Sequence, residues 1–102
     1  MATVLFIVKA TIPTSEEAKF NKWYNEEHCP QVLQFPGLVS AHRYKLLDGD
    51  DKYNYMAVYE IQDEATYRKF VTSNHMKVLR AQYDAHFPMS ERMRSAYTQV
   101  WP

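Results

Sequence analysis

Apolar and polar residues follow two different periods along the chain, and these periods predict four strands and two helices. The apolar run at residues 3–11 is rich in β-branched side chains and ends before Pro13, which is typical of a strand buried on both faces. Three further runs predict strands at 38–47, 53–61 and 93–101. Alternation within the run at 53–61 places five residues on one face: Tyr53, Tyr55, Ala57, Tyr59 and Ile61.

The first helix is expected between the first two strands. Thr14 and Glu17 have the spacing of a capping box, which predicts that the helix begins at Thr14. Because proline disfavours the α conformation in the residue before it, Pro30 should end the helix near Cys29. The stripe that should face the sheet consists of Phe20, Trp23, Tyr24, Glu27 and His28.

The second helix should follow the third strand, with Asp63 as its cap. A break near Ser73 and Asn74 is left open, and residues 83–92 should form a polar connection that could serve as a lid. Between the second and third strands, Asp48-Gly49-Asp50-Asp51 indicates a hairpin turn. The inward stripe of the second helix is predicted to include Tyr67, Phe70, Val71, Asn74 and Val78.

The resulting order, β-α-β-β-α-β, predicts one domain over residues 1–102 with a ferredoxin-like α+β fold. In that fold both helices cover one face of a four-stranded antiparallel sheet. Since the first strand is apolar on both faces, the second face also needs a cover. A second copy of the chain is the simplest one, so we expect a homodimer whose two sheets meet face to face, with the helices outside.

The segment from Trp23 to Pro30 has the pattern W-Y-x-x-E-H-x-P, and P-G at Pro36 and a strand with R-Y at Arg43 follow it. This pattern resembles the EthD-like branch of the dimeric α+β barrel superfamily. The resemblance implies the same fold and dimer, with a pocket between helices and sheet in each subunit. It also implies small-molecule chemistry, because members include cofactor-free isomerases, dehydratases, decarboxylases and oxygenases, as well as haem-handling proteins. Many act on aromatic polyketides or on intermediates of aromatic catabolism, and the histidine that such enzymes tend to use corresponds to His28.

His28 is the first candidate for chemistry. It lies one turn beyond Tyr24 on the predicted inward stripe, and an imidazole can accept and return a proton near neutral pH. The negative end of the helix dipole and the adjacent Glu27 should favour its protonated form. The alternative interpretation is a half-buried histidine that bonds a backbone carbonyl and closes the helix end.

Other candidates lie on the strands and on the second helix. His42 is expected either in the same pocket or in the dimer interface, and His42 or Tyr59 could stabilise an enolate-like oxygen. Arg43 could hold a substrate carboxylate or form an ion pair at a strand end. The His75 side chain could reach the cavity or face the solvent. The candidate substrate-binding residues are Trp23, Tyr24, Arg43, Tyr44, Tyr55, His75 and Tyr97, although strand tyrosines commonly serve packing alone.

Composition excludes several other functions. The 12 basic and 12 acidic residues balance, which disfavours nucleic-acid binding, and no apolar run reaches the roughly 20 residues of a membrane span. The single cysteine, Cys29, makes no internal disulfide and fits a reducing cytoplasm, and the chain start lacks the features of a signal peptide. The sequence has no glycine-rich nucleotide motif and no metal-ligand spacing, so neither a cofactor nor a metal is expected.

These observations predict a cytoplasmic, cofactor-independent enzyme for a small-molecule substrate. The expected reaction is proton transfer by an isomerase or a lyase such as a dehydratase, on an aromatic or conjugated oxygenated metabolite, with His28 as general acid and base. One alternative is a cofactor-free oxygenase of an anthrone-like phenol. Another is a haem or small-ligand binding protein with His28 or His75 as axial ligand, and the last is a dimerising accessory protein without a useful pocket.

Overall fold

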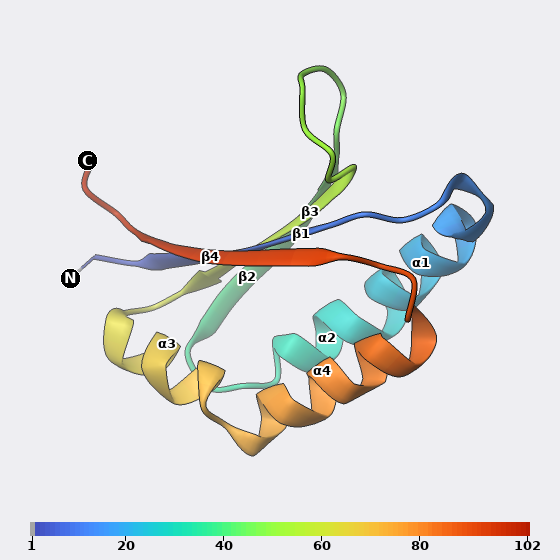
Figure 1. Ribbon diagram of the computed structural model, residues 1–102. Helices are drawn as coiled ribbons and strands as arrows, with labels where there is room; N and C mark the ends of the chain where they lie inside the picture. The colour runs from blue at the N-terminus through green and yellow to red at the C-terminus, as the bar shows by residue number, and fades with distance from the viewer. Residues whose placement is uncertain (1) are drawn as a thin grey trace.

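A computed structural model describes residues 2–102 as a four-stranded antiparallel sheet with the helices packed on one face (Figure 1). The strands are β1 (Val4–Ala10), β2 (Leu38–Lys45), β3 (Tyr55–Ile61) and β4 (Arg92–Thr98), in the spatial order β2-β3-β1-β4. One helical region joins β1 to β2 and another joins β3 to β4. This is the ferredoxin-like arrangement, so the predicted α+β fold is confirmed.

The sheet has one buried face and one open face. On β1, Val4, Phe6 and Val8 are buried, whereas Leu5 between them is 39% exposed. The second face of this strand is therefore open in the single chain, and its burial by a second copy stays a prediction. On β3 the predicted inward residues Tyr55, Ala57, Tyr59 and Ile61 are all buried, while Tyr53 precedes the strand and is half-buried.

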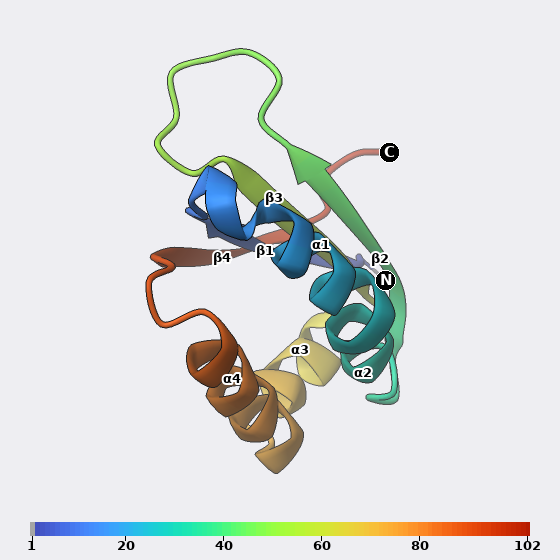
Figure 2. The same cartoon turned by 90° about the vertical axis from the view of Figure 1, so that its right-hand side faces the viewer.

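The first helical region is longer than predicted. Helix α1 (Glu17–Trp23) continues through a π-helical segment, η2 (Tyr24–His28), into α2 (Cys29–Val32) (Figure 2). In the wider turn of η2 the Cys29 N–H donates to the carbonyl of Tyr24, five residues back. Pro30 falls in the first turn of α2, directly after this wider turn, and the helical chain continues past it. The predicted end near Cys29 is therefore wrong.

The helical region begins at Thr14 as predicted, but its conformation and capping differ from the expectation. A 3₁₀ turn, η1 (Thr14–Glu16), precedes α1, and the expected capping box between Thr14 and Glu17 does not form. Glu17 instead accepts hydrogen bonds from the Tyr55 hydroxyl (3.3 Å) and from Lys45 Nζ (3.1 Å). Glu27, expected on the inward stripe, is exposed, while Phe20, Trp23, Tyr24 and His28 are buried as predicted.

The second helical region is broken in two, at the place that the sequence left open. Asp63 accepts a bond from the Thr66 N–H (2.8 Å) and caps α3 (Glu64–Val71), as predicted. Ser73 accepts a bond from the Met76 N–H (3.1 Å) and caps α4 (Asn74–His86). The break resets the helical phase, so the residues of α4 that pack inward are Met76, Leu79 and Tyr83.

Two consequences of this break correct the sequence analysis. Asn74 and Val78, expected on the inward stripe, are exposed. Because α4 continues to His86, the connection to β4 covers only residues 87–91 instead of 83–92. Among residues 2–102, no helix is both long and apolar enough to cross a bilayer.

Candidate functional site

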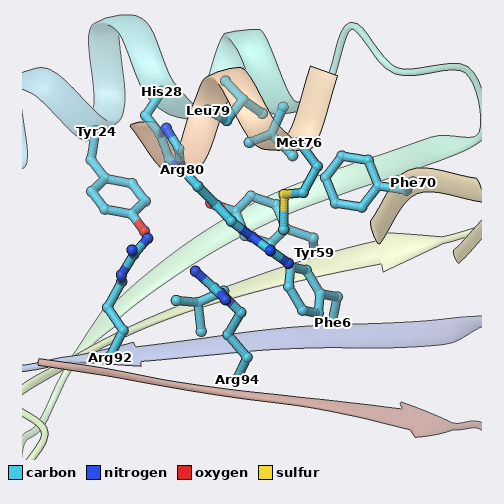
Figure 3. Close-up of a pocket in the computed structure, with 12 residues that line it drawn as sticks. Phe6, Tyr24, His28, Tyr59, Phe70, Met76, Leu79, Arg80, Arg92 and Arg94 are labelled. Atoms are coloured by element: carbon cyan, nitrogen blue, oxygen red, sulfur yellow. The ribbon is translucent and has the colours of Figure 1, made fainter. Parts of the chain in front are cut away.

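A cavity lies between the inner face of the sheet and the helices, where η2, α4 and β4 come together (Figure 3). Its apolar lining consists of Phe6, Val8, Val32, Phe70, Met76 and Leu79. Its polar lining consists of Tyr24, His28, Tyr59, Arg80, Arg92 and Arg94. The empty space, mouth included, is about 350 Å³, but the centre of a water molecule can move through only about 20 Å³ of it. In this conformation the cavity has room for about one water.

Aromatic side chains hold the imidazole of His28 in the wall of this cavity. The residue is only 8% exposed, and its ring stacks on Trp23 with centroids 4.7 Å apart and planes 21° apart. The edge of Tyr24 packs against it at 4.7 Å. The Nδ1 atom is buried and has no hydrogen-bond partner among residues 2–102. Nδ1 of His28 therefore makes no bond to a backbone carbonyl, which is the kind of contact that the alternative interpretation expected.

The electrostatic environment of His28 opposes protonation. Burial lowers the pKa of His28 to about 4, and the positive charges of Arg92 and Arg43 act in the same direction. The sequence analysis expected the protonated form, on account of the helix dipole and Glu27. That expectation is wrong because the helical chain continues past His28 and because Glu27 is exposed. At neutral pH the imidazole is uncharged and able to accept a proton.

Two buried tyrosines contribute neutral phenols to the same wall. Burial raises the pKa of Tyr24 and of Tyr59 above the ordinary value, so both hydroxyls stay protonated at neutral pH and can donate. The Tyr59 hydroxyl is 3.9 Å from the sulfur of Cys29. Burial also raises the pKa of the Cys29 thiol, which keeps it in the unreactive protonated form.

Three arginines complete the site, and the sequence analysis missed them. On β4, Arg92 and Arg94 pair with Ala10 and Val8, whose side chains face the helices, so both arginines project inward. Arg80 comes from α4 (Figure 3). The alternation R-x-R at residues 92–94 was the available signal, but the predicted last strand began at Met93 and left Arg92 in the preceding connection.

Of the residues predicted for the site, Tyr24, His28 and Tyr59 line the cavity. Trp23 lies behind His28 and supports its ring. Arg43 faces the helices but is engaged elsewhere: its guanidinium donates to Asn21 and Asn25 and lies 4.4 Å from the centre of the Tyr24 ring.

Two further candidates have structural contacts outside the cavity lining. The Tyr55 hydroxyl donates to Glu17 and accepts from the Asn21 side chain. His75 Nε2 lies 2.7 Å from the Gln31 carbonyl oxygen, which links α4 to the chain just before the end of α2. Within residues 2–102, no three His, Cys, Asp or Glu side chains come together as a metal site.

His42, Tyr44 and Tyr97 lie on the opposite face of the sheet. His42 pairs with Val58, and Tyr97 pairs with Leu5, both on the open face. The expectation that His42 shares a pocket with His28 is therefore not met. Strand alternation on β2 turns Arg43 toward the helices, and its neighbours His42 and Tyr44 must then face away.

Comparison with known proteins gives one curated relative and several similar structures. The chain is 37% identical over 60 residues to "core atranone cluster (CAC) protein 1" of Stachybotrys chlorohalonatus. The match covers 58% of this chain and 25% of that relative, so the chain spans about a quarter of the relative's length.

Solved structures with this fold cover nearly the whole chain. A DABB family protein with a ferredoxin-like fold from Mesorhizobium loti has a TM-score of 0.74 at 11% identity, covering 99% of this chain and 100% of the other. An ethyl tert-butyl ether D (EthD) family protein from Bacillus halodurans has a TM-score of 0.67 at 17% identity, covering 93% and 97%. SnoaB, a cofactor-independent oxygenase from Streptomyces nogalater, has a TM-score of 0.66 at 19% identity, covering 98% and 95%.

The resemblance to the EthD-like, ferredoxin-like branch is thus confirmed at the level of the fold. The model of the family described as "Domain of unknown function (DUF4286)" matches residues 3–96, and the chain belongs to this family.

Proposed function

We propose that this protein is a cofactor-independent enzyme that removes a proton from a small aromatic or conjugated oxygenated substrate, with His28 as the general base. The observation that carries the proposal is the buried imidazole in the cavity wall, with no partner for Nδ1 among residues 2–102. A positioned, neutral imidazole of this kind is the group most often used for general base catalysis. Its packing against Trp23 holds the ring in one orientation.

The low basicity of His28 in the empty site favours a particular kind of substrate. Burial, Arg92 and Arg43 all disfavour the imidazolium. A substrate that becomes an anion when it loses its proton introduces a negative charge beside these positive groups. That charge stabilises the imidazolium and the arginines together, so proton transfer to His28 is easiest from substrates whose anion is delocalised.

Tyr24 and Tyr59 are the candidate donors to that anion. Both are neutral phenols in the cavity wall, and a donor in a dry cavity stabilises a developing oxyanion more strongly than water does. Return of the proton to another carbon would complete an isomerisation. Departure of a leaving group from the anion would complete a lyase reaction such as a dehydration.

A second candidate follows from the similarity to SnoaB, which is named a cofactor-independent oxygenase. In that reaction the anion of an anthrone-like phenol would react with O₂. The substrate CH₂ group would become a carbonyl, and the second oxygen atom would leave as water. Proton removal by His28 is common to both candidates, and O₂ uptake during turnover separates them.

The haem-binding alternative has less support. His75 Nε2 lies against the Gln31 carbonyl oxygen, and the cavity beside His28 has room for about one water in this conformation. Binding of a porphyrin would require the contact of His75 with Gln31 to break or the cavity beside His28 to widen.

We also propose that the protein is a homodimer. The open face of the sheet carries apolar side chains, among them Leu5 (39% exposed), Met93 (44%) and Tyr97 (57%). The EthD-like resemblance implies that a second copy covers this face. Leu5→Asp should then convert the dimer to a monomer in analytical ultracentrifugation. A wild-type chain that sediments as a monomer at micromolar concentration would contradict the proposal.

Hydrogen–deuterium exchange tests the enzymatic proposal before the full reaction is known. Candidate phenols, lactones and conjugated ketones are incubated with the protein in D₂O, and the loss of the acidic C–H signal is followed by proton NMR. We expect exchange with the wild-type protein and at least about 100-fold slower exchange with His28→Gln. Arg68→Gln, at an exposed arginine of α3 that pairs with Glu64, is the control and should behave as wild type. Exchange by His28→Gln near the wild-type rate would remove His28 from the mechanism.

A further inference from the structure

We propose that Arg80, Arg92 and Arg94 bind a carboxylate of the substrate, which makes the substrate an aromatic or conjugated carboxylic acid. This inference rests on the proposed function, because it names the substrate class of the same cavity. It also assigns carboxylate binding to three residues of α4 and β4 instead of Arg43, which the sequence offered as one candidate.

The first argument is the convergence of the three side chains. Arg80 reaches into the cavity from α4, while Arg92 and Arg94 rise from β4 on the other side (Figure 3). The close-up shows the Arg80 side chain extending from α4 into the space between the lining residues, toward the sheet. A helix and a strand on opposite sides of the cavity thus bring three positive charges into one small space.

The second argument is the balance of charge around that space. Within residues 2–102, the ion pair at the cluster is the one between Arg92 and Asp84 (2.6 Å), and the Asp84 side chain is 68% exposed. Arg80 and Arg94 form no ion pair in this part of the chain, and the Nε atom of Arg80 is buried without a partner. Burial and the charges of Arg92 and Arg80 lower the pKa of Arg94, which reflects the mutual repulsion. An anion in the cavity would relieve this repulsion and satisfy the free N–H groups.

The third argument concerns the kind of anion. The planar guanidinium group matches a carboxylate with two parallel hydrogen bonds. The rest of the lining is apolar and aromatic, including Phe6, Phe70 and Met76, and suits a flat hydrocarbon body. A free inorganic anion would use the arginines but leave these walls uncovered.

Binding of such an acid would also prepare His28 for proton transfer. The cavity admits about one water while Arg80 extends into it, so the ligand must displace the Arg80 side chain to enter. A carboxylate that pairs with Arg92 would neutralise one of the charges that disfavour the His28 imidazolium. The substrate would thereby raise the basicity of the group that acts on it.

Isothermal titration calorimetry with 2-naphthoate and 2-naphthamide tests the proposal, because the two probes share one ring system and differ in charge. We expect wild-type protein to bind the acid at least about 10-fold more tightly than the amide. Arg80→Gln and Arg94→Gln should each weaken binding of the acid, and each should lower the ratio of acid to amide affinity at least about 10-fold. Arg68→Gln is the matched control, since Arg68 is an exposed arginine of α3 that pairs with Glu64.

The same experiment contains the results that would overturn the proposal. The proposal is wrong if the acid shows no measurable binding at millimolar concentration or if the acid and the amide bind with equal affinity. It is also wrong if the arginine variants bind the acid as wild type does. Displacement of the acid by equimolar inorganic phosphate would also overturn it, because the site would then be a general anion site. Melting curves check that each variant folds, and Arg94→Lys, which keeps the charge, should recover part of the binding.

Failure here and failure of the proposed function give different results. His28→Gln should keep the preference for 2-naphthoate over 2-naphthamide, because it leaves the three arginines in place, while its exchange activity is lost. Normal exchange by His28→Gln together with arginine-dependent binding would retain the acid site and reject the base. Loss of exchange in His28→Gln with no preference for the acid would retain the base and reject the acid site.

Discussion

Acidification from pH 6.5 to pH 4 should destabilise the folded chain by about 3 kcal/mol through His28 alone. The pKa of His28 is lowered from 6.5 to about 4 by burial and by the charges of Arg92 and Arg43. Between these two values the unfolded chain binds a proton that the folded chain does not. The free energy of unfolding therefore rises with pH across this window, by up to about 1.4 kcal/mol per pH unit. The stabilisation is complete above pH 6.5 and is lost as the pH falls to about 4.

Urea unfolding at several pH values from 4 to 8 measures this contribution, with His28→Gln as the variant that does not titrate. In the unfolded chain other groups also begin to bind protons at the acidic end of this range, among them Asp51, Asp63 and Glu91, whose pKa values in the folded chain are lowered mainly by their hydrogen bonds. Their effects cancel in the difference between wild type and variant at the same pH and protein concentration. That difference should fall by about 3 kcal/mol between pH 7 and pH 4.

His86→Gln serves as the control, because His86 is exposed at the end of α4. The difference between wild type and this control should show a much weaker dependence on pH. If the wild-type and His28→Gln curves run parallel from pH 8 to pH 4, His28 is not held in a neutral, desolvated state. The account of the cavity as a dry site with a neutral base would then be refuted.

Three further outcomes test the fold around the site. In urea titrations, Gly37→Ala should lower the free energy of unfolding by more than Gly49→Ala does. Both glycines have a positive φ (+95° and +123°), so both substitutions strain the backbone. A Cβ at Gly37 would also clash with the Thr66 side chain, whereas a Cβ at Gly49 would meet open space. Equal losses would show that the chain relaxes around Thr66. Ser73→Ala should cost about 1 kcal/mol in the same assay, because it removes the cap of α4, and an unchanged midpoint would contradict the capping role. Cys29 should react with a thiol reagent at pH 7 far more slowly in the native protein than in urea, because burial raises its pKa, and equal rates would show an exposed thiolate.

Short-range patterns in the sequence were sufficient to predict the order of the elements. The inward face of β3 followed from alternation, because side chains on a strand point to opposite sides at every step. The cap at Asp63 followed from the chemistry of helix starts, where a side-chain oxygen accepts a free N–H three residues on. Both features depend on neighbours within a few residues.

Features that balance local preference against packing were predicted less well. Pro30 reads as a helix stop, but the π-helical turn of η2 lets the chain continue to Val32 and places Trp23, Tyr24 and His28 against the core. The break at Ser73 was left open, and the residues that α4 buries depend on the phase that this break resets. In both places tertiary packing selects one of several local conformations.

By itself, the sequence determined the α+β topology and the position of His28 on an inward helical stripe, because both follow from periodicity within one element. Only the tertiary structure decided which other groups meet His28. The face to which His42 points and the meeting of Arg80 with Arg92 and Arg94 depend on strand register and on the packing of α4 over β4. The charge state of His28 was decided at the same level, because burial and arginines from other elements set its pKa.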